Sequence, residues 1–187
     1  MDKIGVIHGR FQPLHIGHME YLLAGKARCE YLIVGISNPD VIMTKFTEAN
    51  PHRSALLSNP LTYFERFQMT AGALLEAGLK RSEFDIVPFP INFPDSLFNY
   101  VPRDAKYYMT IYDAWSVEKQ KSLETLGCDI EILWTRTNDE KSVSGTEIRT
   151  LIAANKPWEH LVPPYVYQYV INHQLDLRLR SMFRENG

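Results

Sequence analysis

The chain has 187 residues, of which 45% are hydrophobic and 22% are charged. This length and composition are typical of a single globular domain, which we expect to span residues 1–187. Lys and Arg number 20 against 22 Asp and Glu, a formal net charge of −2, which argues against a nucleic-acid partner held by bulk electrostatics but leaves local phosphate binding open.

The sequence contains no pattern typical of export or membrane insertion. Its first residues form no apolar stretch long enough for a signal peptide, and no uncharged apolar run reaches the roughly 20 residues of a membrane span. The two cysteines, Cys29 and Cys128, lie in no metal-binding or redox motif, as expected in a reducing compartment. We therefore expect a cytoplasmic protein with no membrane partner.

Short apolar runs alternate with segments of helical periodicity along the chain. The predicted strands are Ile4–His8, Tyr31–Ile36, Phe84–Phe89, Tyr107–Tyr112 and Ile130–Trp134. The predicted helices between them are Met19–Ala27, Phe64–Leu75 and Trp115–Leu126. This alternation predicts an α/β fold: a Rossmann-like, doubly wound parallel sheet of about five strands with helices on both faces. Ligands of such sheets bind at the loops that follow the strands.

Two stretches interrupt this alternation. Residues 38–60 are polar, contain three prolines and show no clear period, which is typical of a lid, a binding loop or a disordered segment. Beyond Ala154 the pattern is helical only, at Trp158–Leu161, from Pro164 to about Leu175, and in an arginine-bearing tail. We therefore predict a core over about residues 3–155 and a short C-terminal helical extension over about residues 156–187.

The first motif that suggests chemistry is G-R-F-Q-P-L-H-I-G-H over residues 9–18, directly after the first predicted strand. His15 and His18 are three residues apart, so at a helix start their side chains share one face. Such a start attracts phosphate, and Gly9 and Gly17 would let the backbone approach a ligand. A metal site is the alternative, but no further ligand cluster is evident. The other histidines are predicted to be solvated or satisfied: His8, His52, His160 and His173.

The second motif is S-G-T-E-I-R over residues 144–149. Ser144 with Glu147 forms a capping box, so helix initiation alone can explain the pattern. An arginine in the first turn opposes the helix dipole, however, so Arg149 also indicates an anionic ligand. A third segment, Asn59–Arg66, carries a capping box of its own, and helix initiation explains most of it.

Motifs that the chain does not contain narrow the function further. There is no G-x-x-x-x-G-K-[ST] run, which disfavours a P-loop ATPase or kinase. There is no G-x-G-x-x-G run, which disfavours a dinucleotide-binding dehydrogenase. There is also no G-x-S-x-G elbow, so an α/β-hydrolase has no support.

Residues 9–18 match the G-x-F-x-P-x-H-x-G-H signature of the nucleotidylyltransferase superfamily, and residues 144–149 resemble its second signature. Together with the Asn59–Arg66 block, they make the chain most similar to archaeal-type nicotinamide-nucleotide adenylyltransferases. The resemblance covers roughly residues 3–155. It implies AMP transfer from ATP to nicotinamide mononucleotide, giving NAD and pyrophosphate, with Mg²⁺ bridging the phosphates. In that family the acceptor attacks the α-phosphorus directly.

The same resemblance assigns roles to individual residues. Catalytic roles fall to His15, His18 and Arg149, with His18 at the α-phosphate and Arg149 at the leaving pyrophosphate. Nucleotide binding falls to Gly9, Arg10, Phe11, Gln12, Gly17, Ser144, Gly145 and Thr146. Substrate-binding roles fall to Arg66 and to Phe98, which stands where the family tends to place a nicotinamide-stacking Trp. No protein ligand for a metal is implied, because phosphate oxygens and water would carry the Mg²⁺.

The sequence departs from the family in two places. The segment from Asn38 to Ser58 is longer than its archaeal counterpart, and Phe98 replaces the usual Trp. These differences keep other acceptors open: phosphopantetheine, FMN, or a phosphorylated alcohol that receives a cytidylyl group. A nucleotide-binding regulatory protein without turnover is a further alternative. The sequence leaves open the amide or acid form of a pyridine acceptor and whether the chain forms a homo-oligomer.

Overall fold

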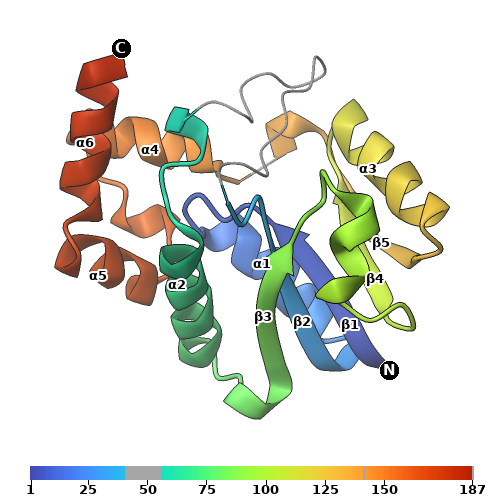
Figure 1. The fold of residues 1–187 in the computed structure, drawn as a ribbon. Helices are drawn as coiled ribbons and strands as arrows, with labels where there is room; N and C mark the ends of the chain where they lie inside the picture. Colours follow the sequence, from blue (N-terminus) through green and yellow to red (C-terminus); the bar gives the residue numbers. More distant parts are fainter. Residues whose placement is uncertain (41–55, 141, 187) are drawn as a thin grey trace.

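The computed structural model describes residues 1–40, 56–140 and 142–186, with a five-stranded parallel sheet at the centre (Figure 1). The strands are β1 (Asp2–Gly9), β2 (Cys29–Ser37), β3 (Phe84–Phe89), β4 (Lys106–Ile111) and β5 (Asp129–Thr135). Their order is β3-β2-β1-β4-β5. The predicted five-stranded, doubly wound sheet is therefore confirmed, and the chain reverses its direction of winding between β1 and β4.

Helices cover both faces of this sheet (Figure 1). They are α1 (Ile16–Lys26), α2 (Tyr63–Glu76), α3 (Ala114–Thr125), α4 (Gly145–Ala153), α5 (Pro164–Asn172) and α6 (Leu175–Asn186). Short 3₁₀ turns lie at Leu56–Ser58, Arg81–Glu83, Pro94–Asn99, Asn138–Glu140 and Glu159–Leu161. Within the described part of the chain, no helix is both long enough and apolar enough to cross a membrane.

The alternation of side chains along β1 divides the core into two clusters. Ile7 is fully buried on the face covered by α1 and α2, where it packs in one cluster with Leu22 and Met69. Val6 is fully buried on the other face, in a cluster with Phe89 and with Leu123 of α3. A strand buried on both faces reads as a continuous apolar run, which is why the strand prediction succeeded.

Side-chain caps fix where the helices begin. The predicted capping boxes are both present, with Thr62 and Glu65 at the start of α2 and Ser144 and Glu147 at the start of α4. At α3, Asp113 accepts a hydrogen bond from the backbone N–H of Ser116 at 2.8 Å. The predicted long loop ends in the turn at Leu56–Ser58, while residues 41–55, with His52, lie outside the described residues.

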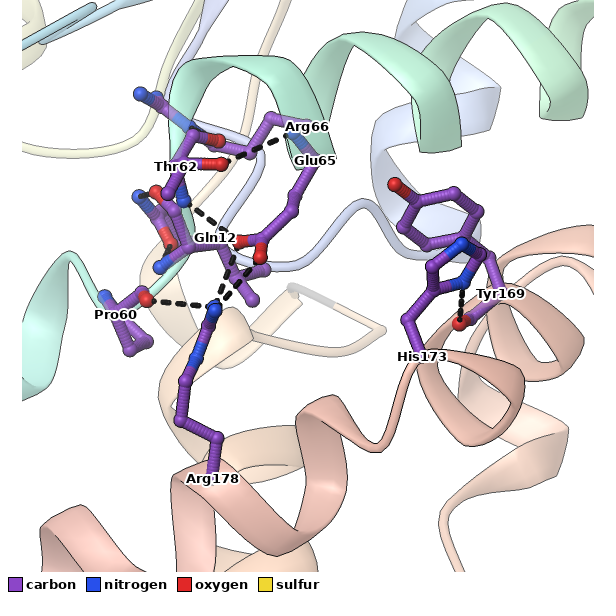
Figure 2. Close-up of polar contacts among 9 residues, drawn as sticks. Gln12, Pro60, Thr62, Glu65, Arg66, Tyr169, His173 and Arg178 are labelled. Atoms are coloured by element: carbon purple, nitrogen blue, oxygen red, sulfur yellow. Dashed lines mark hydrogen bonds and ion pairs between the residues drawn. The ribbon is translucent and has the colours of Figure 1, made fainter.

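The C-terminal helices pack against earlier helices, α5 on α2 and α6 on α4. An ion pair ties α6 to the start of α2: Arg178 donates to both carboxylate oxygens of Glu65 at 2.7 and 2.6 Å (Figure 2). Burial alone would raise the pKa of the Glu65 carboxyl, but hydrogen bonds from Arg178 and Thr62 outweigh it and hold the pKa below its usual value. The predicted turn at Trp158–Leu161 is a 3₁₀ turn, and the predicted helical tail is α6.

Candidate active site

A cavity of about 500 Å³ opens at the carboxyl edge of the sheet, beside the point where the winding reverses. Its wall contains every residue that we predicted to be catalytic or to bind nucleotide: Gly9, Arg10, Phe11, Gln12, His15, Gly17, His18, Ser144, Gly145, Thr146 and Arg149. The fold thus brings two motifs that are distant in the sequence to one site. The roles of these residues stay predictions.

His15 and His18 form a stacked pair at the start of α1. Their ring centroids are 3.6 Å apart and their planes are inclined by 20°. His15 is the N-cap of the helix, and its Nδ1 accepts a hydrogen bond from the backbone N–H of His18 at 3.2 Å. The two imidazoles therefore stand together beside a helix N-terminus, a position that favours an anionic ligand.

Phe11 supports this pair from within the protein. Its side chain is fully buried, and its ring meets His18 edge-on with centroids 5.0 Å apart. A Cβ at Gly9 would lie 2.7 Å from the Phe11 ring. We predicted that Gly9 lets the backbone approach a ligand, but the space beside it is occupied by Phe11. Gly9 therefore shapes the site by letting the loop fold back on itself.

The side chain of Gln12 is engaged by the backbone of the Asn59–Arg66 block. Its amide nitrogen donates to the carbonyl of Leu61 at 3.0 Å, and its amide oxygen accepts from the N–H of Leu61 at 2.9 Å. The side chain is only 3% exposed. Gln12 therefore contributes mainly by holding the loop in place, and its own carbonyl accepts a hydrogen bond from Arg149.

Arg149 is a buried cation on the cavity wall. Its guanidinium donates to the carbonyl of Gln12 and to the hydroxyl of Thr146 at 3.1 Å, while its Nε is buried without a hydrogen-bond partner among the described residues. Burial lowers the pKa of Arg149 to about 10, so the group is still charged at neutral pH. A buried positive charge with spare hydrogen-bonding capacity beside Ser144 and Gly145 favours a phosphate ligand.

Arg66 does not line this cavity. It is 2% exposed and lies in the wall of a separate, smaller cavity of about 170 Å³. Its guanidinium donates to four backbone carbonyls, those of Thr62, Arg10, Ser37 and Asn38. Figure 2 shows the contact with Thr62. This geometry favours a structural role for Arg66 over the predicted substrate-binding role, because the group joins the loops after β1 and β2 to the start of α2.

Phe98 also lies away from the cavity wall. The 3₁₀ turn Pro94–Asn99 packs it against the core cluster on the α3 face, and the guanidinium of Arg103 covers its ring at 3.8 Å. The β3–β4 connection reaches the cavity instead through Ile91 and Asn92. Phe98 is only partly buried there, and its place away from the cavity wall does not favour the predicted stacking on a pyridine ring.

Several cavity residues were missed by the sequence analysis. His8 is 4% exposed on the cavity wall, and neither ring nitrogen has a hydrogen-bond partner among the described residues. It is therefore neither solvated nor satisfied, contrary to our prediction, whereas His160 and His173 are exposed as expected. Helix α3 contributes Trp115 and Lys119. The available signal for His8 was a polar residue at the end of a buried strand.

The two carboxylates on the cavity wall, Glu20 and Asp113, are both engaged. Arg136 donates to both oxygens of Glu20 at 2.8 and 3.1 Å, which holds the pKa of that carboxyl below its usual value, and Asp113 caps α3. In residues 1–40, 56–140 and 142–186, no three His, Cys, Asp or Glu side chains gather as a metal site.

The sheet order and a cavity at the reversal point define a doubly wound, Rossmann-like α/β protein. Residues 6–151 match the cytidylyltransferase-like family. The chain belongs to this family of nucleotidylyltransferases, which confirms the superfamily that its motifs resemble.

Individual relatives differ in their substrates. The chain is 50% identical over 177 residues to a phosphonoformate cytidylyltransferase of Streptomyces viridochromogenes, covering 95% of both chains. It is 31% identical to a nicotinamide-nucleotide adenylyltransferase of Pyrococcus abyssi, covering 95% of this chain and 88% of the relative. Among solved structures it resembles a bifunctional NMN adenylyltransferase/ADP-ribose pyrophosphatase of Francisella tularensis, solved with AMP and a manganese ion, with a TM-score of 0.66 and 16% identity. That match covers 97% of this chain and 52% of the larger protein.

Proposed function

We propose that this protein transfers CMP from CTP to a small phosphonate acid such as phosphonoformate, releasing pyrophosphate. The observation that carries the proposal is the 50% identity, over 95% of both chains, to a phosphonoformate cytidylyltransferase. The position of Phe98 supports it, because the residue in the position of a pyridine-stacking side chain is partly buried against the core and does not line the large cavity. The proposal moves the donor and acceptor away from the ATP and nicotinamide mononucleotide that the motifs suggested.

The chemistry proposed is a direct displacement. An oxygen of the acceptor phosphonate attacks the α-phosphorus of CTP, a new P–O–P bond forms, and the bond to the bridging oxygen of the β-phosphate breaks. The electron pair leaves with pyrophosphate. No group on the protein is covalently modified, so catalysis depends on positioning and on stabilising the negative charge that builds on the transferred group.

In this mechanism different groups on the cavity wall bind different phosphates of the triphosphate. His18, held by the stack with His15 and by Phe11, donates to the α-phosphate as charge develops there. Arg149 and the start of α4 bind the β- and γ-phosphates and stabilise the pyrophosphate that departs. Mg²⁺, when bound, would neutralise phosphate charge.

A second candidate is the adenylyl transfer to nicotinamide mononucleotide that the motifs first indicated. It is favoured by relatives such as the archaeal enzyme of Pyrococcus abyssi, at 31% identity. The histidine pair and Arg149 serve either reaction equally, because both reactions use the same triphosphate chemistry. The two candidates differ only in the base and in the acceptor.

A matrix of substrates tests the proposal. CTP and ATP are each combined with phosphonoformate, nicotinamide mononucleotide or nicotinate mononucleotide in the presence of Mg²⁺, and pyrophosphate release is followed with the product mass. We expect the fastest release with CTP and phosphonoformate. Fastest release with ATP and a pyridine mononucleotide would favour the second candidate, and binding of nucleotide without release in any combination would favour a regulatory protein.

A further inference from the structure

The mechanism above gives no task to His8, which is the most unusual polar group in the cavity. Both of its ring nitrogens are buried and lack hydrogen-bond partners among the described residues. Buried polar groups are nearly always paired, because an unpaired one loses its hydration without compensation. An unpaired imidazole on the wall of a ligand-sized cavity therefore points to a partner that comes from the substrate.

The surrounding strands hold the imidazole in one plane. The ring of His8 on β1 stacks on Phe89 of β3, with centroids 4.3 Å apart and planes inclined by 3°. Gly35 of β2 lies between them, paired with His8 in the sheet, and a Cβ there would come within 2.5 Å of the Phe89 ring. The stack therefore requires a residue without a side chain at position 35 of the middle strand. His8 is thus preoriented by Phe89 and by the space that Gly35 leaves.

The electrostatic surroundings of His8 come from α3. Burial and then the charge of Lys119 lower the pKa of His8 well below its usual value, so the imidazole is neutral at pH 7. A neutral imidazole offers one N–H donor and one acceptor nitrogen. Lys119 lies on the same cavity wall, with its ammonium 4.7 Å from the centre of the Trp115 ring. A donor beside a cation is a combination that recognises an acidic group.

We propose that His8 and Lys119 form the acceptor subsite, where they bind the second acidic group of a compact diacid whose first acidic group attacks the nucleotide. This inference rests on the proposed function and narrows its acceptor to molecules such as phosphonoformate, with a carboxylate next to a phosphonate. The subsite lies at the end of β1 and beside the middle of α3, whereas the predicted triphosphate groups lie on α1 and α4. A carboxylate there accepts the His8 N–H bond and pairs with the Lys119 ammonium.

Access to the subsite requires a local movement. Neither ring nitrogen of His8 has exposed surface, although the residue lines the cavity. The acidic group reaches the imidazole once a neighbouring side chain of the cavity wall moves, and Lys119 on the same wall has a flexible four-carbon stem that permits such a movement. We therefore expect acceptor binding to reorder the Lys119 side chain while the stacked His8 ring stays in place.

The experiment measures acceptor binding without turnover. Phosphonoformate is titrated by calorimetry into protein saturated with a CTP analogue whose α–β bridge is a methylene group. In His8→Phe, which keeps an aromatic ring on Phe89, we expect phosphonoformate to bind at least about tenfold more weakly, from the loss of a hydrogen bond to a charged group. The CTP analogue should bind within about twofold of wild type, and the thermal midpoint without acceptor should be equal or higher because unpaired buried nitrogens are removed.

A matched control and a rescue separate recognition from packing. His173→Phe changes a histidine that stacks on Tyr169 outside the cavity, and it should leave phosphonoformate binding unchanged. His8→Gln restores a donor and should recover part of the affinity. The inference is overturned if wild type does not bind phosphonoformate, if His8→Phe binds it normally, or if His8→Phe loses phosphonoformate and the CTP analogue equally. Binding that depends on His8 but gives no pyrophosphate release with CTP would refute only the proposed function.

Discussion

Arg66 and Arg149 are two buried arginines near the starts of their helices, and they differ in how far the protein satisfies their hydrogen-bond donors. Burial lowers the pKa of each to about 10, and each lies in the helix that one of the sequence motifs begins. Arg66 distributes its guanidinium over four backbone carbonyls. Arg149 donates hydrogen bonds to the Gln12 carbonyl and the Thr146 hydroxyl and keeps a buried Nε without a partner among the described residues.

The comparison indicates that a charged residue in a motif is a candidate for ligand binding when the protein leaves some of its hydrogen-bond donors without partners. Carbonyl dipoles from the loops after β1 and β2 satisfy Arg66, so its charge stabilises the junction of those loops with α2. Arg149 faces the larger cavity with donor capacity to spare. We therefore assign Arg66 to stability and propose Arg149 for phosphate binding.

The largest effect on turnover is expected in the cavity that Arg149 faces, at His18. Removing a preoriented donor to developing charge typically costs on the order of 10²–10³ in turnover number, so His18→Ala should lower kcat by about that factor with an unchanged thermal midpoint. Steady-state pyrophosphate release measures it. His160→Ala, at an exposed position, is the control. Near-normal turnover in His18→Ala would remove His18 from the mechanism.

Arg66→Met should lower stability rather than substrate affinity. The change removes the side-chain donor of the Arg10, Ser37 and Asn38 carbonyls, whereas the Thr62 carbonyl keeps the backbone N–H of residue 66. We expect the free energy of unfolding to fall by roughly 2–3 kcal/mol, as for unpaired buried acceptors. Denaturant unfolding of Arg66→Met beside Arg149→Met makes the comparison. Arg149→Met should stay within about 1 kcal/mol of wild type, because it removes a charge that burial disfavours. Equal destabilisation of the two variants would contradict the structural role of Arg66 and the ligand-binding role of Arg149.

A smaller effect is expected next to Arg66, at the ion pair between Glu65 and Arg178. Because the folded protein holds the pKa of Glu65 below its usual value, the pair contributes stability above the ordinary glutamate pKa of about 4.3 and loses it as the pH falls through the folded value. Glu65→Gln keeps the capping box and should cost about 1 kcal/mol at pH 7. Unfolding measured from pH 7 down to about pH 3 should show this difference shrinking below about pH 4.3. A difference that stays constant over this range would contradict the account.

The sequence predicted the scaffold well because local rules determine it. Buried strands such as Phe84–Phe89 read as continuous apolar runs, and the capping boxes at Thr62 and Ser144 mark true helix starts. The two motifs also predicted which residues line the cavity. Their spacing along the chain carried this information, since both follow strands whose ends meet at one edge.

The rest depended on contacts that no local pattern encodes. The partners of Arg66 come from the two connections that follow β1 and β2, and the direction in which Phe98 points depends on the 3₁₀ turn that holds it. The ring of His8 is oriented by stacking on Phe89 across Gly35, and this contact forms only when three strands are aligned. Residues that act through tertiary packing therefore escaped the motif analysis.

Calorimetric binding of CTP to Arg149→Met tests the central claim most directly, with wild type and Arg66→Met as references. We expect Arg149→Met to bind CTP roughly 10- to 100-fold more weakly, the loss of charge-assisted contacts to phosphate, and Arg66→Met to bind within about threefold of wild type when folded. CTP affinity that is unchanged in Arg149→Met, or that falls equally in both variants, would contradict the account.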